Sequence, residues 1–278
     1  MGTMDADGKG IGKPPHSRKV RLDELLVRRG LAPNRSHAQR LIMAGEVWLE
    51  DRRLDKAGQL VPEDAVVRVE QGLRYVSRGG LKLEKALQQF GVFPEGWVCA
   101  DIGASTGGFT DCLLQHGAAK VYAIDVGYGQ LAWQLRQDPR VVVIERVNIR
   151  HLDALPEPVR LAVVDVSFIG LGLVLPRVAS LLGPAGQVIA LIKPQFEVGK
   201  GAVGKGGVVR EPRLHRETVR KVLDEAGELG LAPAGLVRSP IVGPAGNVEF
   251  LALLRAGDAP ADASVVEQWL QHAVEGNT

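Results

Sequence analysis

Apolar residues recur in short continuous runs between residues 98 and 254, and stretches with a helical period separate these runs. Continuous apolar strands are typical of a sheet covered on both faces. Strands that alternate with helices favour an α/β fold with a doubly wound, mostly parallel sheet. The strands expected are 98–102, 120–125, 141–145, 161–166, 187–193, a weaker one near 235–238, and 248–254. The helices expected are 81–90, 107–116, 129–137, 171–182 and 212–229.

The connection between the last two strands, residues 240–247, is short. A short connection favours a hairpin, so the last strand should form an antiparallel edge of a seven-stranded sheet.

The first 80 residues follow a different pattern. Leu22, Leu25 and Leu26 form a helical stripe that ends near Gly30, and Asn34 or Ser36 can cap a second helix. Strands at 47–50 and 66–70 would complete a small α+β domain. The resulting division is a disordered leader (1–17), a small domain (18–70), a linker (71–80), a main domain (81–256) and a helical C-terminal tail (257–278).

Composition narrows the class of protein. The net charge of +2, from 34 basic and 32 acidic residues, indicates no nucleic-acid or membrane partner by itself. Cys99 and Cys112 are too few for a disulfide framework or a cysteine zinc site, so we expect no metal. No signal sequence and no apolar run of about 18 residues is present, so we expect a soluble, cytoplasmic protein. We also expect a monomer.

A glycine-rich loop follows the first strand of the main domain. Gly103, Gly107 and Gly108 let the backbone approach a ligand at the start of a helix. The spacing is not that of a dinucleotide loop, and a Walker lysine is missing. Asp125 ends the second strand, where it could accept both ribose hydroxyls. Asp101 opens the loop and suits a cationic ligand, such as the amino-acid part of S-adenosylmethionine.

Two lysines and two carboxylates could meet at the carboxyl ends of the strands. Asp165 ends the fourth strand and Lys193 the fifth, Lys82 lies in the helix before the first strand, and Glu249 opens the last strand. Methyl transfer to a ribose hydroxyl requires that the hydroxyl lose its proton near the transition state. A lysine kept neutral by burial or by a second cation can take that proton. Either Lys193 or Lys82 could be this base, and the carboxylates would orient the lysines.

The motifs SRGGLKL, DIGASTGGFTD, DVSFI, LIKPQFE and VGKGGVVR resemble the FtsJ/RrmJ-type 2′-O-ribose methyltransferases. With the small domain included, residues 18–256 look like the TlyA family. This resemblance implies a class I (Rossmann-like) methyltransferase fold and methylation of cytidine ribose in ribosomal RNA. It implies Lys82, Asp165, Lys193 and Glu249 as the catalytic tetrad. The residues it implies for S-adenosylmethionine are Asp101, Gly103, Ser105, Thr106, Gly107, Gly108, Phe109, Asp125, Val126, Asn148 and Ile149, with Asn148 and Ile149 at the adenine.

Residues 18–60 carry ten basic and six acidic side chains, and they resemble the α-L RNA-binding motif of a small-subunit ribosomal protein. We expect ribosomal RNA or ribosomal subunits as partners. The loop 197–211 is interpreted as a mobile cationic lid over RNA, although a plain flexible loop fits equally well. The candidate RNA-binding residues are Arg21, Arg28, Arg29, Arg35, Arg40, Lys200, Lys205 and Arg210.

Three other functions stay open. A base-methylating RNA methyltransferase would commonly carry an NPPY-like or cysteine motif, which the segment 165–168 lacks. A ribosome-assembly factor with a methyltransferase-like fold would bind RNA without catalysis. A membrane-active haemolysin is the third, since members of the resembled family have carried that label.

Overall fold

The computed structural model describes residues 18–43, 46–50, 52–54, 56–69, 74–199, 203–204, 206–243 and 245–276. The chain divides into two compact units, with the division between residues 72 and 73. The expected leader, residues 1–17, lies outside the described residues.

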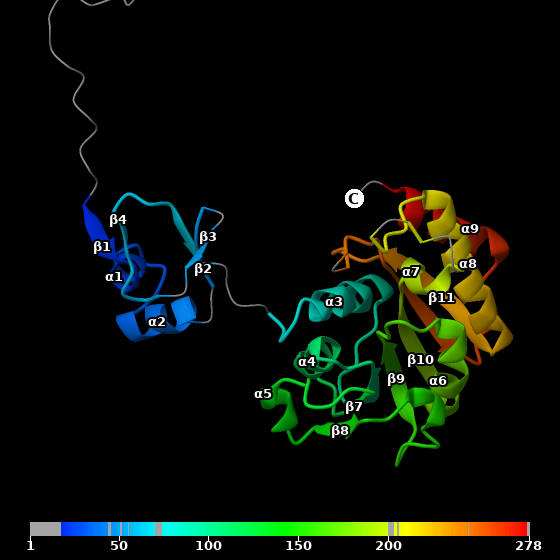
Figure 1. The fold of residues 1–278 in the computed structure, drawn as a ribbon. Coiled ribbons are helices and arrows are strands. Elements are labelled where there is room, and N and C mark those ends of the chain that lie inside the picture. Colours follow the sequence, from blue (N-terminus) through cyan, green and yellow to red (C-terminus); the bar gives the residue numbers. More distant parts are fainter. Residues whose placement is uncertain are drawn as a thin grey trace, which may run out of the picture. The chain divides into compact units, whose positions relative to one another are not determined.

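The N-terminal unit packs two short helices against short strands (Figure 1). The helices are α1 (Leu22–Arg28) and α2 (Arg35–Met43). Strands β1 (Lys19–Arg21) and β4 (Leu60–Pro62) pair antiparallel. Strand β2 (Val47–Leu49) lies between β3 (Arg52–Leu54) and β5 (Val67–Val69), also antiparallel. The Asn34 side chain accepts the His37 N–H at 2.9 Å, so Asn34 caps α2 as the sequence suggested.

A seven-stranded sheet forms the centre of the second unit, in the order β11-β12-β10-β9-β6-β7-β8. The strands are β6 (Val98–Ile102), β7 (Lys120–Asp125), β8 (Val141–Glu145), β9 (Val159–Val164), β10 (Leu182–Ile192), β11 (Leu231–Arg238) and β12 (Phe250–Ala256). Six strands run parallel to one another, and β12 alone runs in the opposite direction. The expected mostly parallel sheet with an antiparallel last strand is therefore confirmed. The expectation that the last strand forms an edge was wrong, because β12 is inserted between β10 and β11 and the edge strands are β11 and β8.

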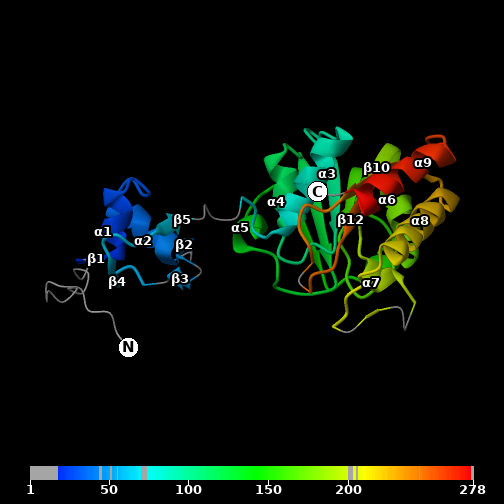
Figure 2. The same cartoon turned by 90° about the horizontal axis from the view of Figure 1, so that it is seen from above.

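Helices cover both faces of this sheet (Figures 1 and 2). One face carries α3 (Gly79–Phe90), α4 (Gly108–Gln115) and α5 (Trp133–Arg136). The other carries η2 (Leu171–Leu173), α6 (Leu175–Leu181), α8 (Pro212–Glu228), α9 (Ala263–Leu270) and the π-helical turn η3 (Gln271–Glu275). The short helices η1 (Ile149–His151) and α7 (Pro194–Glu197) lie in connections.

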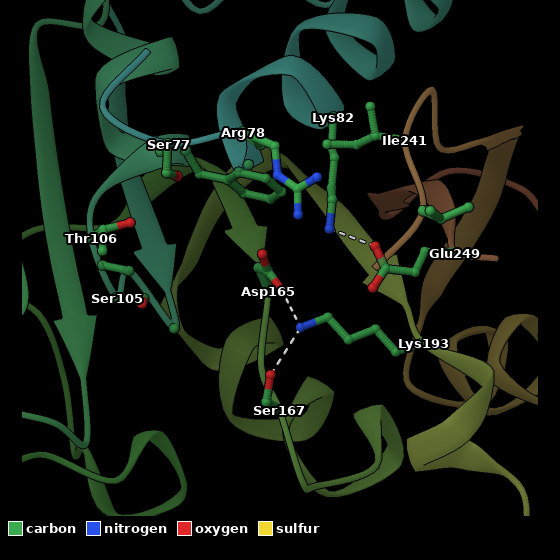
Figure 3. Close-up of a pocket in the computed structure, with 16 residues that line it drawn as sticks. Ser77, Arg78, Lys82, Ser105, Thr106, Asp165, Ser167, Lys193, Ile241 and Glu249 are labelled. Atoms are coloured by element: carbon green, nitrogen blue, oxygen red, sulfur yellow. Dashed lines mark hydrogen bonds and ion pairs between the residues drawn. The ribbon is translucent and has the colours of Figure 1, made fainter. Parts of the chain in front are cut away.

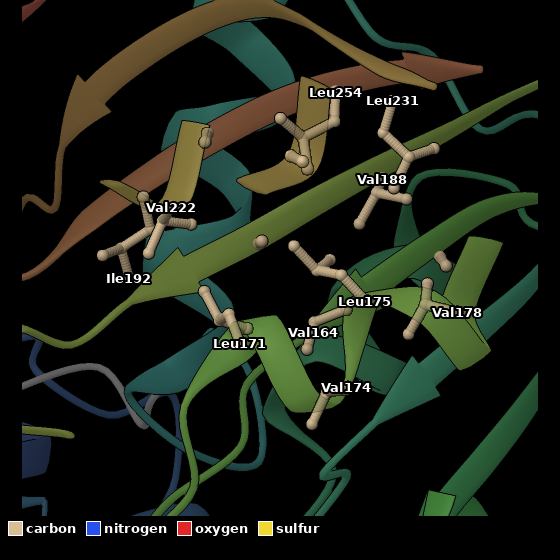
Figure 4. Packing of buried hydrophobic residues seen from close by; sticks show 14 of the residues in the cluster. Val164, Leu171, Val174, Leu175, Val178, Val188, Ile192, Val222, Leu231 and Leu254 are labelled. Atoms are coloured by element: carbon tan, nitrogen blue, oxygen red, sulfur yellow. The ribbon is translucent and has the colours of Figure 1, made fainter. Parts of the chain in front are cut away.

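Each central strand contributes side chains to the hydrophobic cores on both faces of the sheet, because successive side chains point to opposite faces. In β10, Val188 and Ile192 belong to the core shown in Figure 4, whereas Ile189 and Leu191 belong to the core under α3 and α4. This two-sided burial explains the continuous apolar runs in the sequence.

Several expected boundaries differ from the structure. Strand β9 ends at Val164 and β10 at Ile192, and β12 begins at Phe250, so Asp165, Lys193 and Glu249 lie one residue outside their strands. Of the expected linker, residues 79–80 are the first two residues of α3, and 71–73 lie outside the described residues.

The remaining differences concern short or weakly marked elements. Helix α5 covers only four residues of the expected 129–137, and β11 extends well before 235. Strand β3, between the expected strands at 47–50 and 66–70, was not among the expected elements. The expected helix at the C-terminal tail is present as α9 and η3.

Candidate active site and RNA-binding residues

Two adjoining cavities open at the carboxyl ends of the central strands. Residues Gly103, Ser105, Asp165 and Ser167 line both, so the cavities form one continuous groove. The larger cavity, of about 570 Å³, extends along the ends of β7 and η1. The smaller, of about 290 Å³, extends toward α3 and the start of β12. The sheet order reverses between β6 and β9, and this switch point is where open α/β sheets bind ligands.

The glycine-rich loop is tied to the end of the next strand. Asp125 accepts the Ser105 N–H at 2.7 Å and the Gly127 N–H at 2.6 Å, which fixes its carboxylate at the wall of the larger cavity. Gly103 has φ +86°, and a Cβ there would lie 2.4 Å from the carbonyl oxygen of Asp165. Glycine is therefore required at this position, because it lets the loops after β6 and β9 approach each other.

Most of the expected cofactor residues line the groove. The larger cavity is lined by Gly103, Ser105, Asp125, Val126, Asn148 and Ile149, and the smaller one also by Thr106, Gly108 and Phe109. The Asn148 side chain accepts the Arg150 N–H at 3.1 Å and caps η1. Phe168, which the sequence-based list omitted, also lines the larger cavity and is 90% exposed.

Two expected cofactor residues do not reach the groove. The Asp101 side chain is fully buried beneath the loop and accepts the Thr110 hydroxyl at 2.7 Å. Burial raises the pKa of Asp101 to about 7, against the lowering effect of the Thr110 bond. A Cβ on Gly107 would meet Leu135, so this glycine serves packing against α5. Asp101 and Gly107 thus lie beneath or beside the loop rather than in the lining of either cavity.

The four residues of the proposed tetrad meet in the smaller cavity as two ion pairs (Figure 3). Lys82 Nζ lies 2.5 Å from Glu249 Oε2, and Lys193 Nζ lies 2.5 Å from Asp165 Oδ1. The Lys82–Glu249 pair is nearly inaccessible, with Glu249 only 1% exposed. Each lysine is therefore held by one carboxylate.

The strand ends explain why these residues meet. Ile192 and Phe250 are register partners in the antiparallel β10–β12 pair. The residue after β10, Lys193, and the residue before β12, Glu249, consequently lie at the same edge of the sheet. Pro194 begins α7 directly after Lys193, so the backbone turns away from the sheet there.

Three further side chains line the smaller cavity and were not selected from the sequence. Ser167 accepts a hydrogen bond from Lys193 Nζ at 3.0 Å, which gives this lysine a second partner. Ser77 and Arg78 come from the segment before α3. Ser167 could have been predicted from the sequence, because it lies two residues after Asp165 at the end of the same strand.

The candidate RNA-binding residues of the small unit are engaged within that unit. Arg21 and Arg35 both pair with the buried Asp23, at 2.9 Å each. The other contacts are Arg28 with Glu63 and Glu24, Arg29 with the carbonyl oxygens of Glu63 and Ala65, and Arg40 with His37. Arg21 is half-buried and the other four arginines are exposed, so these side chains are accessible while they also hold contacts within the unit.

In the 197–211 loop only part of the expected cationic set is described. Arg210 is exposed, whereas Lys200 and Lys205 lie outside the described residues. In the described part of the chain, no helix is long and apolar enough to cross a membrane. The same residues contain no cluster of three His, Cys, Asp or Glu side chains suited to a metal ion.

Comparison with known proteins identifies both units. Residues 75–256 match the FtsJ-like methyltransferase model, and residues 20–67 match the S4 domain. The chain is 48% identical to the "Putative rRNA methyltransferase YqxC" of Bacillus subtilis, covering 93% of this chain and 94% of that protein. It is 46% identical to the "16S/23S rRNA (cytidine-2'-O)-methyltransferase TlyA" of Mycobacterium tuberculosis, covering 93% and 97%.

A solved structure titled "Putative hemolysin from Streptococcus thermophilus" superposes with a TM-score of 0.71 at 44% identity, covering 93% of this chain and 96% of that one. The resemblance drawn from the motifs is thereby confirmed for both units. This chain belongs to the TlyA family of FtsJ-like methyltransferases, with an S4 domain at its N-terminal end.

Proposed function

We propose that this protein transfers a methyl group from S-adenosylmethionine to the ribose 2′-hydroxyl of cytidine in ribosomal RNA. The observation that carries the proposal is the pair of ion pairs, Lys82–Glu249 and Lys193–Asp165, in a cavity that adjoins the glycine-rich loop. The relatives named as rRNA methyltransferases supply the substrate class.

The residues of the larger cavity fit a nucleoside cofactor. Its volume of about 570 Å³ lies within the range of small-molecule sites, about 300–1,000 Å³. Asp125 would accept the ribose hydroxyls, and Asn148 and Ile149 would contact the adenine. The cofactor, when bound, supplies an electrophilic methyl group on a sulfonium ion.

Residues of this chain would accept the proton that the attacking 2′-hydroxyl loses. The wall shared by the two cavities contains Asp165, whose ion pair places Lys193 Nζ beside the cofactor groove. In the ion pair this lysine is an ammonium, so it would first release its own proton to solvent. Its neutral amine would then take the proton that the hydroxyl loses as the methyl group is transferred. Glu249 would orient Lys82 across the same cavity and keep its charge balanced.

Mass-spectrometric mapping of methylated nucleosides in rRNA treated with the protein tests this function. We expect 2′-O-methylcytidine with wild type, and a loss of at least about a hundredfold in rate for Lys193→Ala. Calorimetry should show that Lys193→Ala still binds S-adenosylmethionine. The matched control is Lys221→Ala, an exposed lysine paired with Glu225 on α8.

Two outcomes would contradict the proposal. Wild-type-like transfer by Lys193→Ala would remove this lysine from the mechanism. RNA binding by wild type without any cofactor binding or methylation would favour a non-catalytic assembly factor.

A further inference from the structure

The charges in the smaller cavity do not balance. Its lining contains three cations and two carboxylates, and four of these five groups are consumed by the two ion pairs. The remaining charge is Arg78. Its side chain makes no hydrogen bond or ion pair with any residue that the structure describes. The cavity therefore presents one uncompensated guanidinium.

Arg78 is placed over the reacting groups by its position before α3. It is the residue that precedes the helix, four positions before Lys82, and residues four apart share one face of a helix. Figure 3 shows the guanidinium beside Lys82 at the same cavity. By contrast Arg74, four residues earlier, is paired with Glu84.

The backbone that carries Arg78 is fixed against α4. Asp111 accepts the Val76 N–H at 2.8 Å, and Gln115 donates to the carbonyl oxygen of Arg74 at 2.9 Å. The Tyr75 ring is buried against Gly80, where a Cβ would lie 2.2 Å from the ring. The origin of the Arg78 side chain is thus held in place, while its tip is free to bind.

The substrate of the proposed function carries an anion next to the reacting atom. In RNA, the carbon that bears the 2′-hydroxyl is bonded to the carbon whose oxygen carries the 3′-phosphodiester. When that hydroxyl reaches Lys193 and Asp165, the phosphodiester must lie within the same small cavity or at its mouth. A guanidinium matches two phosphate oxygens with parallel N–H donors, better than a lysine does.

We propose that Arg78 binds the 3′-phosphodiester of the nucleotide being methylated. This inference rests on the proposed function, because it assumes an RNA ribose in the smaller cavity. By binding this phosphodiester, Arg78 positions the 2′-hydroxyl next to the two lysines. The S4 domain would supply affinity for the rRNA, whereas Arg78 would fix the position of the single nucleotide that is methylated.

Steady-state kinetics of Arg78→Ala and Arg78→Lys on rRNA test the proposal. For Arg78→Ala we expect the KM for rRNA to rise about 10- to 100-fold, the effect of losing a charge-assisted hydrogen-bonded pair. The slope of log affinity for rRNA against log salt should fall by about one unit. Arg78→Lys should keep the slope, because it keeps the charge, and recover only part of the KM.

The control variant is Arg213→Ala, an exposed arginine on α8 that is paired with Glu217. It should change neither quantity. Calorimetry with S-adenosylmethionine should give wild-type affinity for all variants, which also shows that they are folded. An unchanged KM and salt slope in Arg78→Ala would overturn the proposal, and so would a loss of cofactor affinity. Absence of methylation by wild type would instead count against the proposed function itself.

Discussion

At the scale of single residues, the candidate active site contains charged side chains that are buried. Lys82 and Glu249 are almost fully buried, and Glu249, directly before β12, lies 167 residues further along the chain. Burying two charges costs free energy that a close pair only offsets, so such a pair adds little net stability. Removing one partner is different, because the other charge is left buried without compensation.

Glu249→Gln should accordingly lower the free energy of unfolding by about 3 kcal/mol and abolish methyl transfer. The double variant Lys82→Met, Glu249→Gln should lose less stability than the sum of the two single variants, because no orphaned charge remains. Chemical denaturation of the four proteins measures this coupling. Glu225→Gln, which breaks an exposed pair, should change stability by less than about 1 kcal/mol. Additive losses would show that Lys82 and Glu249 are not coupled.

Asp101 makes stability depend on pH near neutrality. The unfolded chain releases this proton near pH 4, whereas the folded chain releases it near pH 7 because of burial. Between these values the folded state binds more protons, so this group's contribution to stability falls as the pH rises. The stability of Asp101→Asn relative to wild type should therefore increase by about 1.4 kcal/mol per unit from pH 5 to pH 7, and should level off above pH 7.

Thermal or urea unfolding at a series of pH values measures this difference. Asp138→Asn is the control, because the Arg140 side chain lowers the pKa of Asp138 and its contribution is lost only below about pH 4. Its difference from wild type should be constant over the same range. A constant difference for Asp101→Asn as well would mean that Asp101 is already ionised in the folded protein.

At the scale of elements, a side chain of the β11–β12 connection joins this connection to the 197–211 loop. The β11–β12 connection carries Glu249, and two residues earlier it carries Asn247, which is 1% exposed. Asn247 accepts the Val209 N–H at 3.0 Å and donates to the carbonyl oxygen of Gly207 at 2.9 Å. This side chain therefore joins the end of the glycine-rich 197–211 loop to the connection that holds Glu249.

Asn247→Ala should release residues 206–211 from this connection. Hydrogen exchange at the Val209 amide should become faster, and the free energy of unfolding should fall by about 1–3 kcal/mol, since two backbone groups lose their buried partner. Methyl transfer should fall with it, because Glu249 loses its support. Ser180→Ala, which removes an exposed bond to the Arg177 carbonyl oxygen, should leave exchange at Val209 unchanged. Unaltered exchange in Asn247→Ala would show that the loop is held by other contacts.

The same scale explains which elements the sequence could predict. Strands β6, β7 and β8 have the expected bounds because each is a continuous apolar run ended by polar or glycine residues. Strand β10 begins at Leu182 rather than 187, because its first residues, LGPAG, carry no strand pattern and pair with β9 only across an irregularity in register. The three-residue strands β1, β3 and β4 are too short to show a period. The candidate cluster followed from strand ends, but the partners within it required the fold.

At the scale of the whole molecule, a near-neutral total charge conceals two different units. Residues 1–75 carry 14 basic and 11 acidic groups, and the remainder carries 20 and 21. Excess positive charge in the unit that matches an S4 domain supports its proposed role in docking on rRNA. Its arginines differ in how far they also hold the unit together. Arg29 donates to two backbone carbonyl groups, whereas the one side-chain hydrogen bond of Arg40 among the described residues is to the His37 ring.

Because of this difference, variants of Arg40 and Arg29 can distinguish an effect on rRNA binding from an effect on stability. Arg40→Gln should weaken rRNA binding and lower its salt slope by about one unit, with no change in melting temperature. Arg29→Gln should lower the melting temperature as well, because the Glu63 and Ala65 carbonyl groups lose their donor. Fluorescence anisotropy with rRNA at several salt concentrations, together with thermal unfolding, measures both effects. Arg213→Gln in the catalytic unit should change neither. If Arg40→Gln keeps the full salt slope, this face of α2 does not contact phosphates and the docking surface lies elsewhere on the unit.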